Sequence, residues 1–119
     1  MIDHVVLNVS DLSTSRVFYE EALEPLGIQL LGDYEGYIGF GRGKEAHFWL
    51  TARQATSQNV HIAFGCDERS TVDAFYMRAM AAGGEDNGAP GVREIYHPKY
   101  YGAFVLDPDG NNIEAVCHQ

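Results

Sequence analysis

Three residues of the sequence have side chains that commonly bind divalent metals, and each lies in a short apolar run. His4 precedes VVL, His61 precedes IAF, and Glu114 lies between Ile113 and Ala115. Imidazoles and carboxylates are typical ligands of Mn²⁺, Fe²⁺, Ni²⁺ and Zn²⁺. Burying an ionised carboxylate is costly, and two neutral imidazoles would leave its charge uncompensated unless a cation lay between them. A single strand histidine is more often a hydrogen-bonded core residue, but the three residues together predict a metal site.

An internal repeat relates the two histidines. Shifting the chain by 57 positions, the separation of His4 and His61, aligns HVVLNVSDLSTSRVFYEEAL with HIAFGCDERSTVDAFYMRAM without a gap. The shift also superposes Phe18 on Phe75. Self-similarity at a fixed spacing indicates a structural unit that is used twice.

Each copy of the unit is expected to form one strand, one helix and three further strands. The opening strands are rich in β-branched and aromatic residues. Ser or Asp residues that can cap a helix precede each predicted helix, and Gly residues follow its last turn. A strong turn signal, DPDGN at 107–111, joins the last two strands. The strands are expected at 4–9, 28–31, 37–40, 47–51, 60–64, 93–96, 103–106 and 113–117, with 93–96 inside a loop that runs from 85 to 99.

The alternation of side chains along a strand places the candidate ligands on one side of the predicted sheets. His4 and His61 each point away from the face on which the following helix packs. In the last strand Ile113 and its alternate residues form the apolar face, which leaves Glu114 on the other side. The three candidate ligands are therefore expected on the side without helices.

Length, composition and charge limit the class of protein. A chain of 119 residues suits one domain, and no linker divides residues 1–119, so the two copies, about 1–56 and 57–119, are expected to share one sheet system. Eight basic against 17 acidic residues give a net charge of −9, which argues against binding to nucleic acid or to anionic membranes. Cys66 and Cys117 are expected to be free thiols. No membrane span or signal peptide is apparent, so a cytoplasmic location is expected.

Three segments of the chain resemble the vicinal oxygen chelate superfamily, which includes glyoxalase I, extradiol dioxygenases, bleomycin resistance proteins and fosfomycin thiol transferases. They are DHVVLNVSDLSTSRVFYEEALEPLG at the start, NVHIAFGC in the middle and FVLDPDGNNIEAV near the end. The resemblance implies an α+β fold of two βαβββ modules, with an open curved mixed sheet around a divalent metal and the helices outside. It implies metal ligands at His4, His61 and Glu114, and a homodimer.

The resemblance also shows a departure from glyoxalase I. That enzyme has a second glutamate ligand in the last strand of its first module, and Trp49 occupies the matching position here. The internal repeat gives the same match, because it lays Phe48-Trp49-Leu50 over Ile113-Glu114-Ala115. An indole cannot bind the metal, so the expected site has two histidines and one carboxylate, with open positions for a substrate.

The resemblance implies a glyoxalase-like lyase or isomerase, in which the metal acts as a Lewis acid on a small substrate that chelates it through vicinal oxygens. An extradiol-dioxygenase-like or thiol-transferase enzyme is an alternative, and a non-catalytic drug-binding protein of the bleomycin-resistance type is another. Glu114 and His97 are the candidate bases. Tyr100 and Tyr101, in the segment 96–101, are candidates for a substrate wall, with Trp49 and Phe104 as the pocket floor; a surface loop that packs on the sheet is equally open. His47 and His118 are expected to be plain surface residues.

Overall fold

The computed structural model describes all residues from 1 to 119. Two four-stranded sheets and two longer helices make up the chain, in the order strand, helix, three strands, repeated once. The predicted α+β fold of two βαβββ modules is confirmed. We call residues 1–56 module 1 and residues 57–119 module 2. Neither helix is long and apolar enough to cross a membrane.

Module 1 begins with β1 (Val5–Asn8) and α1 (Leu12–Leu23), followed by a short 3₁₀ turn, η1 (Glu24–Leu26). The strands β2 (Gln29–Tyr34), β3 (Tyr37–Arg42) and β4 (Glu45–Thr51) complete it. The Asp11 side chain accepts a hydrogen bond from the Thr14 amide and so caps α1. β1 pairs in parallel with β4, and the sheet order is β1-β4-β3-β2.

Module 2 repeats this plan with β5 (His61–Cys66), α2 (Arg69–Ala81), β6 (Glu85–Val92), β7 (Tyr101–Leu106) and β8 (Asn112–Cys117). The order β5-β8-β7-β6, with β5 parallel to β8, is that of the first sheet. The expected strand at 93–96 is wrong, because those residues form a turn. The glycine-rich stretch before them becomes β6, which pairs with β7 through two register irregularities that absorb its uneven backbone.

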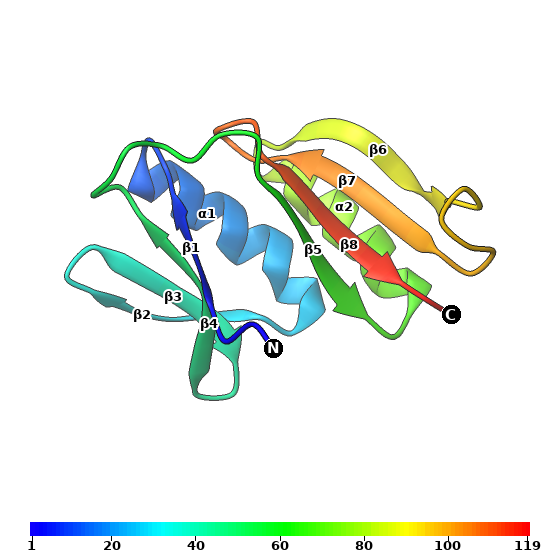
Figure 1. Cartoon of the computed structure of the whole chain (residues 1–119), viewed down its shortest axis with the longest axis horizontal. Helices are drawn as coiled ribbons and strands as arrows, with labels where there is room; N and C mark the ends of the chain where they lie inside the picture. Colours follow the sequence, from blue (N-terminus) through cyan, green and yellow to red (C-terminus); the bar gives the residue numbers. More distant parts are fainter.

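The two sheets do not share strands, so the expectation of one common sheet system is not met. Every strand pair lies within one module. Figure 1 shows the two sheets side by side, with α1 and α2 adjacent to each other behind them. Side chains rather than backbone meet between β1 and β5: Val5, Ile62 and Phe64 line a cavity there. This leaves an edge of β1 and an edge of β5 without a strand partner.

One continuous hydrophobic cluster joins the two modules. It contains Leu7, Phe18 and Phe40 from module 1 and Phe75 and Ile113 from module 2, all fully or almost fully buried. The helix faces of both sheets therefore point inward. The opposite faces, which carry the candidate ligands, point outward, as the strand alternation predicted.

Candidate metal centre

Glu114 is the buried polar residue around which the candidate site is organised. It lies in β8 and only 1% of its surface is exposed. His61 Nε2 lies 2.8 Å from Glu114 Oε1, and the hydroxyl of Tyr100 donates to Glu114 Oε2. Both oxygens of this carboxylate therefore have a hydrogen-bond partner.

This network changes the physical reason for the burial of Glu114. The sequence predicts a cation here because a buried carboxylate beside neutral imidazoles would otherwise be uncompensated. The Tyr100 hydroxyl, which comes from the turn before β7, supplies a second donor, and hydrogen bonds of this kind lower the cost of burying a charge. Burial of Glu114 is thus accounted for by His61 and Tyr100, and the case for a metal depends instead on the geometry of the ligands.

Tyr100 is fitted closely against the carboxylate. Burial, followed by the hydrogen bond to Glu114 and the charge of this carboxylate, raises the pKa of the Tyr100 phenol well above its usual value. Its ring packs against Tyr96, with centroids 4.8 Å apart. A Cβ on Gly102 would lie 3.2 Å from both Glu114 Oε2 and Tyr100 Cε1, so the glycine leaves room for this contact. Sequence reasoning missed Gly102, because only its pairing with β8 reveals why no side chain fits there.

Phe104 lies next to this network; its predicted place in the pocket floor stays a prediction. It pairs with Glu114 across β7 and β8, and its ring centroid is 6.2 Å from that of His61. The guanidinium of Arg93 lies over the same ring, 5.4 Å from its centroid. His61, Tyr100, Phe104 and Glu114 therefore form one cluster on the outer face of module 2.

His4 lies apart from this cluster, on the outer face of module 1. Its Nδ1 is 2.8 Å from Asp3 Oδ1, and about half of its side chain is exposed. It lines a shallow hollow with Val6, Tyr34 and Trp49. No group of three or more His, Cys, Asp or Glu side chains converges within the chain. The three ligands predicted from the sequence are therefore not brought together within one chain.

The remaining candidate residues lie away from Glu114. The hydroxyl of Tyr101 donates to Asp73 on α2 at 2.6 Å, on the helix side of the sheet. His97 Nε2 lies 2.7 Å from His118 Nδ1, and its ring reaches Tyr100 only by an edge contact, with centroids 5.5 Å apart. His118, expected to be a plain surface residue, is thus the partner of His97.

The ligand geometry of His61 and Glu114 suits a shared divalent ion. Two ligands at about 2.1 Å from one metal and at a right angle to each other are about 3 Å apart. His61 Nε2 and Glu114 Oε1 are 2.8 Å apart, so one ion could replace the proton between them with little movement. Carboxylate and imidazole are also a suitable donor set for the first-row metals.

His4 has a hydrogen bond that is typical of metal-binding histidines. Its Nδ1 faces an acceptor carboxylate, so Nδ1 carries the proton and Nε2 keeps a free lone pair. The same hydrogen bond from His4 lowers the pKa of Asp3. Histidines that bind metals usually donate their other ring N–H to a carboxylate or carbonyl, which fixes the tautomer. The adjacent residues Asp3 and His4 were a signal for this pairing in the sequence.

Comparison with known proteins agrees with the fold and the arrangement of the strands. Residues 1–115 match the family model described as the Glyoxalase/Bleomycin resistance protein/Dioxygenase superfamily. The chain therefore belongs to this superfamily. Among curated proteins, none has a sequence that matches.

Solved structures give the same result. The chain is 28% identical to a glyoxalase/bleomycin resistance protein from Albidiferax ferrireducens T118, with 98% of each chain covered and a TM-score of 0.84. It is 25% identical to glyoxalase I from Zea mays, with a TM-score of 0.71, over 99% of this chain and 44% of that one. A glyoxalase/bleomycin resistance protein/dioxygenase family enzyme from Burkholderia phytofirmans PsJN, at 19% identity, shares the fold, with a TM-score of 0.75 over 99% and 98% of the two chains.

Proposed function

We propose that the protein is a metal-dependent, glyoxalase-like lyase or isomerase that acts on a small substrate with vicinal oxygens. The observation that carries the proposal is the 2.8 Å approach of His61 Nε2 to Glu114 Oε1, next to an open outer face. The ion, one of Mn²⁺, Fe²⁺, Ni²⁺ or Zn²⁺, would supply Lewis-acid polarisation of the chelated oxygens. Residues 1–119 act as one domain in this proposal, in the cytoplasm.

The third ligand, His4, comes from a second copy of the chain. Within one chain His4 and Glu114 belong to different outer faces, so a homodimer that sets module 1 of one copy against module 2 of the other completes the site. Two-fold symmetry then produces two equivalent sites. The exposed apolar residues on these faces support this dimer: Val6, Tyr34 and Tyr96 are 42%, 58% and 61% exposed.

The residues of the cluster have separate roles in the proposed reaction. Glu114 would help to hold the ion and would also be the base that accepts the proton from the carbon next to the substrate carbonyl. Tyr100 holds the carboxylate in place by donating a hydrogen bond to Oε2. Phe104 and the partner subunit's Trp49 form apolar walls that exclude water. His97, which is paired with His118, is a weaker base candidate because nothing directs it toward Glu114.

Complementation between two inactive variants tests the proposal most directly. His4→Ala and Glu114→Gln each remove one ligand, so each alone should lose stoichiometric metal. In a mixed dimer the intact His4 of one chain meets the intact His61 and Glu114 of the other, so one of its two sites is restored. Random mixing makes about half of the dimers mixed, so about a quarter of the sites should bind metal again.

The measurement is metal content per chain by mass spectrometry, before and after unfolding and co-refolding of the two variants. Glu20→Gln is the matched control for Glu114→Gln, because Glu20 is a half-exposed carboxylate on α1 that pairs with Arg16 and should not change metal content. No recovery on mixing would contradict the shared site. Assays with methylglyoxal–thiol adducts, catechols and fosfomycin then separate lyase, dioxygenase and thiol-transferase activity; equal inactivity of the wild type and Glu114→Gln on all three would remove the enzyme proposal.

A non-catalytic binding protein of the bleomycin-resistance type is the second candidate. The observation that favours it is the complete hydrogen bonding of Glu114 by His61 and Tyr100, which needs no cation. The net charge of −9 also suits a cationic ligand. A wild-type protein that binds no divalent metal at micromolar concentration and shows unchanged thermal stability in chelator would favour this candidate.

A further inference from the structure

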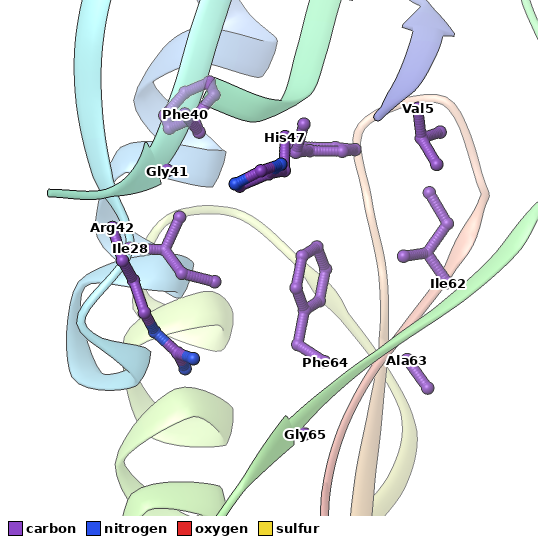
Figure 2. A pocket seen from close by; sticks show the side chains of 11 residues that line it. Val5, Ile28, Phe40, Gly41, Arg42, His47, Ile62, Ala63, Phe64 and Gly65 are labelled. Carbon is purple, nitrogen blue, oxygen red and sulfur yellow. The ribbon is translucent and has the colours of Figure 1, made fainter. Parts of the chain in front are cut away.

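The cavity between β1 and β5 separates the two modules, on the side to which the His61 and Glu114 side chains do not point. Its volume is about 450 Å³, within the range of small-molecule sites. Figure 2 shows Phe64 in the middle of this cavity, with Ile62 and Val5 on one side and Ile28 on the other. The Ile62 and Phe64 side chains alternate with His61 along β5 and line the cavity, and Ala63 and Gly65, on the same face of the strand as His61, also line it.

The walls of the cavity are apolar side chains that the fold does not fully bury. Val5, Ile28, Ile62 and Phe64 are each only half-buried, although they face the interior of the molecule. The ring of Phe64 touches Phe48 of module 1 edge to face, with centroids 5.6 Å apart, and so forms part of the floor. An apolar ligand would remove this remaining surface from water, which is favourable in proportion to the area covered.

Arg42 is the one cationic side chain among the residues that line the cavity. Its Nε and Nη2 both donate to the Leu26 carbonyl, at 3.1 and 2.8 Å, so the guanidinium is held in place before any ligand arrives. It forms no ion pair, unlike Arg16 and Arg78 in the same chain. The edge formed by Nη1 and the second N–H of Nη2 has no protein acceptor, and no carboxylate forms an ion pair with the guanidinium.

His47, at the same rim, does not compete for an anion. Its Nδ1 donates to the Asp3 carbonyl at 2.8 Å, and its Nε2 faces the Glu45 carboxylate, so His47 already has acceptors beside both ring nitrogens. The Glu45 carboxylate lies 3.7 Å from Nε2 and is mostly exposed. The charge available to a ligand inside the cavity is therefore that of Arg42.

We propose that this cavity binds a small hydrophobic carboxylate, with its apolar body between Phe64, Ile28 and Val5 and its carboxylate on Arg42. Arginine is suited to this role because its planar fork can bind both oxygens of a carboxylate. The ligand would fill the space between module 1 and module 2. The proposal does not depend on the metal centre, since no residue is shared by the two sites.

The first experiment compares naphthalene-2-carboxylate with its uncharged carboxamide by calorimetric titration of the wild-type protein. The carboxylate should bind at least fivefold more tightly, and Arg42→Gln should remove this preference. Arg53→Gln is the matched control, because the Arg53 guanidinium lies over the Tyr37 ring, away from the cavity, and should leave both affinities unchanged. Equal affinity of the wild type for the two probes, or no binding of the carboxylate at millimolar concentration, overturns the proposal.

The second experiment locates the ligand. In spectra of protein labelled on its isoleucine methyl groups, naphthalene-2-carboxylate should shift Ile28 and Ile62 but not the exposed Ile95. Val5→Phe should fill the cavity and weaken binding at least tenfold, whereas Val17→Phe, on an exposed part of α1, should not. The methyl shifts decide the question even if Val5→Phe fails to fold. Loss of binding in His61→Ala, with Ile28 unshifted, would place the probe at the metal centre and overturn the proposal.

Octanoate in the same titrations shows whether the cavity accepts alkyl acids as well as aromatic acids. Displacement of the aromatic probe by octanoate, with the same dependence on Arg42, extends the site to alkyl acids. Tight binding of naphthalene-2-carboxylate with no displacement restricts it to aromatic acids. Displacement that is unaffected by Arg42→Gln overturns the role of the guanidinium.

Discussion

The two modules share one backbone plan but have opposite chemistry on their outer faces. In module 1 the residue two positions after the histidine, Val6, pairs with Trp49, and in module 2 the equivalent Ala63 pairs with Glu114. The register of the strands therefore confirms that Trp49 and Glu114 occupy matching positions. A repeated fold fixes where a side chain stands, and the residue type at that place decides whether it can bind a metal.

The residues that pair with Trp49 and Glu114 across each sheet also differ, and they compensate for the different sizes of these two side chains. Trp49 pairs across the sheet with Gly39, whereas Glu114 pairs with Phe104. A large side chain next to a glycine and a smaller one next to an aromatic ring fill similar space in the two modules. Module 1 therefore provides an aromatic surface, and module 2 provides the carboxylate of Glu114. The Tyr34 ring extends the aromatic surface, with its centroid 5.8 Å from that of Trp49.

The largest expected effect comes from filling the space that Gly39 leaves for Trp49. A Cβ on Gly39 would lie 2.8 Å from Trp49 Cζ3 and 3.0 Å from the Ala46 Cβ. Gly39→Ala should therefore lower the free energy of unfolding by about 2 kcal/mol through overpacking. Urea denaturation followed by circular dichroism measures the loss.

Two variants make this first prediction specific. Gly65→Ala, in the sheet of module 2, meets no atom within 4 Å and should change stability by less than about 0.5 kcal/mol. In a Trp49→Leu background the cost of Gly39→Ala should fall by more than half, because only Ala46 still crowds the new methyl group. The same loss in both backgrounds would mean that Gly39 is not there to accommodate the indole.

A second comparison concerns the repeat-related tyrosines of the helices, Tyr19 in α1 and Tyr76 in α2. Tyr19 is fully buried and donates to Asp107 at 2.5 Å, which ties module 1 to module 2. Burial, followed by the Asp107 charge, raises the pKa of the Tyr19 phenol well above its usual value. The pKa of Tyr76 is raised less, through burial and Asp86.

Alkaline pH should reveal this difference. The unfolded chain ionises a tyrosine near pH 10, whereas folded Tyr19 keeps its proton to higher pH. The proton is therefore released on unfolding, and the free energy of unfolding falls above about pH 10 by about 1.4 kcal/mol per pH unit for this one group. Below about pH 10 Tyr19 does not make the free energy of unfolding depend on pH.

The measurement is urea denaturation from pH 8 to pH 11. Tyr19→Phe should lose about 1.5 kcal/mol at pH 8, because the Asp107 carboxylate loses a buried donor, but its decline above pH 10 should be shallower than that of the wild type. Tyr76→Phe should flatten the decline less. An equal slope in Tyr19→Phe and wild type would show that the phenol is not held neutral by the fold.

The sequence predicted most of the fold because its signals were local. The repeat, the strand alternation and the turn at 107–111 placed His4, His61 and Glu114 on outward faces and matched Trp49 to Glu114. The free state of Cys66 and Cys117 was also predicted and is confirmed. Each of these features depends on residues close in the chain or on a fixed shift between the two copies.

What the sequence did not predict depends on tertiary packing. The strand at 85–92 exists because β7 offers it hydrogen bonds, although its glycines and proline suggested a loop. The separation of the two outer faces follows from the packing of α1 on α2 and of Phe48 on Phe64, contacts between residues far apart in sequence. The hydrogen bond of Tyr100 to Glu114 requires the path of the 93–100 turn, which no local pattern specifies.

The smallest expected effect tests whether that hydrogen bond matters. Tyr100→Phe removes the donor to a buried carboxylate oxygen and should lower the free energy of unfolding by about 1 kcal/mol, since His61 still satisfies the other oxygen. Tyr34→Phe in module 1 is the matched control: its ring packs near Trp49, its side chain is mostly exposed, and its hydroxyl has no partner to lose, so stability should not change.

The same pair of variants separates a structural role of Tyr100 from a role at the candidate metal centre. If Tyr100 only supports the fold, Tyr100→Phe should bind divalent metal as tightly as the wild type, once its lower stability is allowed for. If Tyr100 holds Glu114 in the orientation that meets His61, metal affinity should fall by about tenfold, the loss typical of partners that orient a ligand. Titration with Ni²⁺ followed by calorimetry distinguishes these results, and unchanged affinity together with unchanged stability would remove Tyr100 from the site altogether.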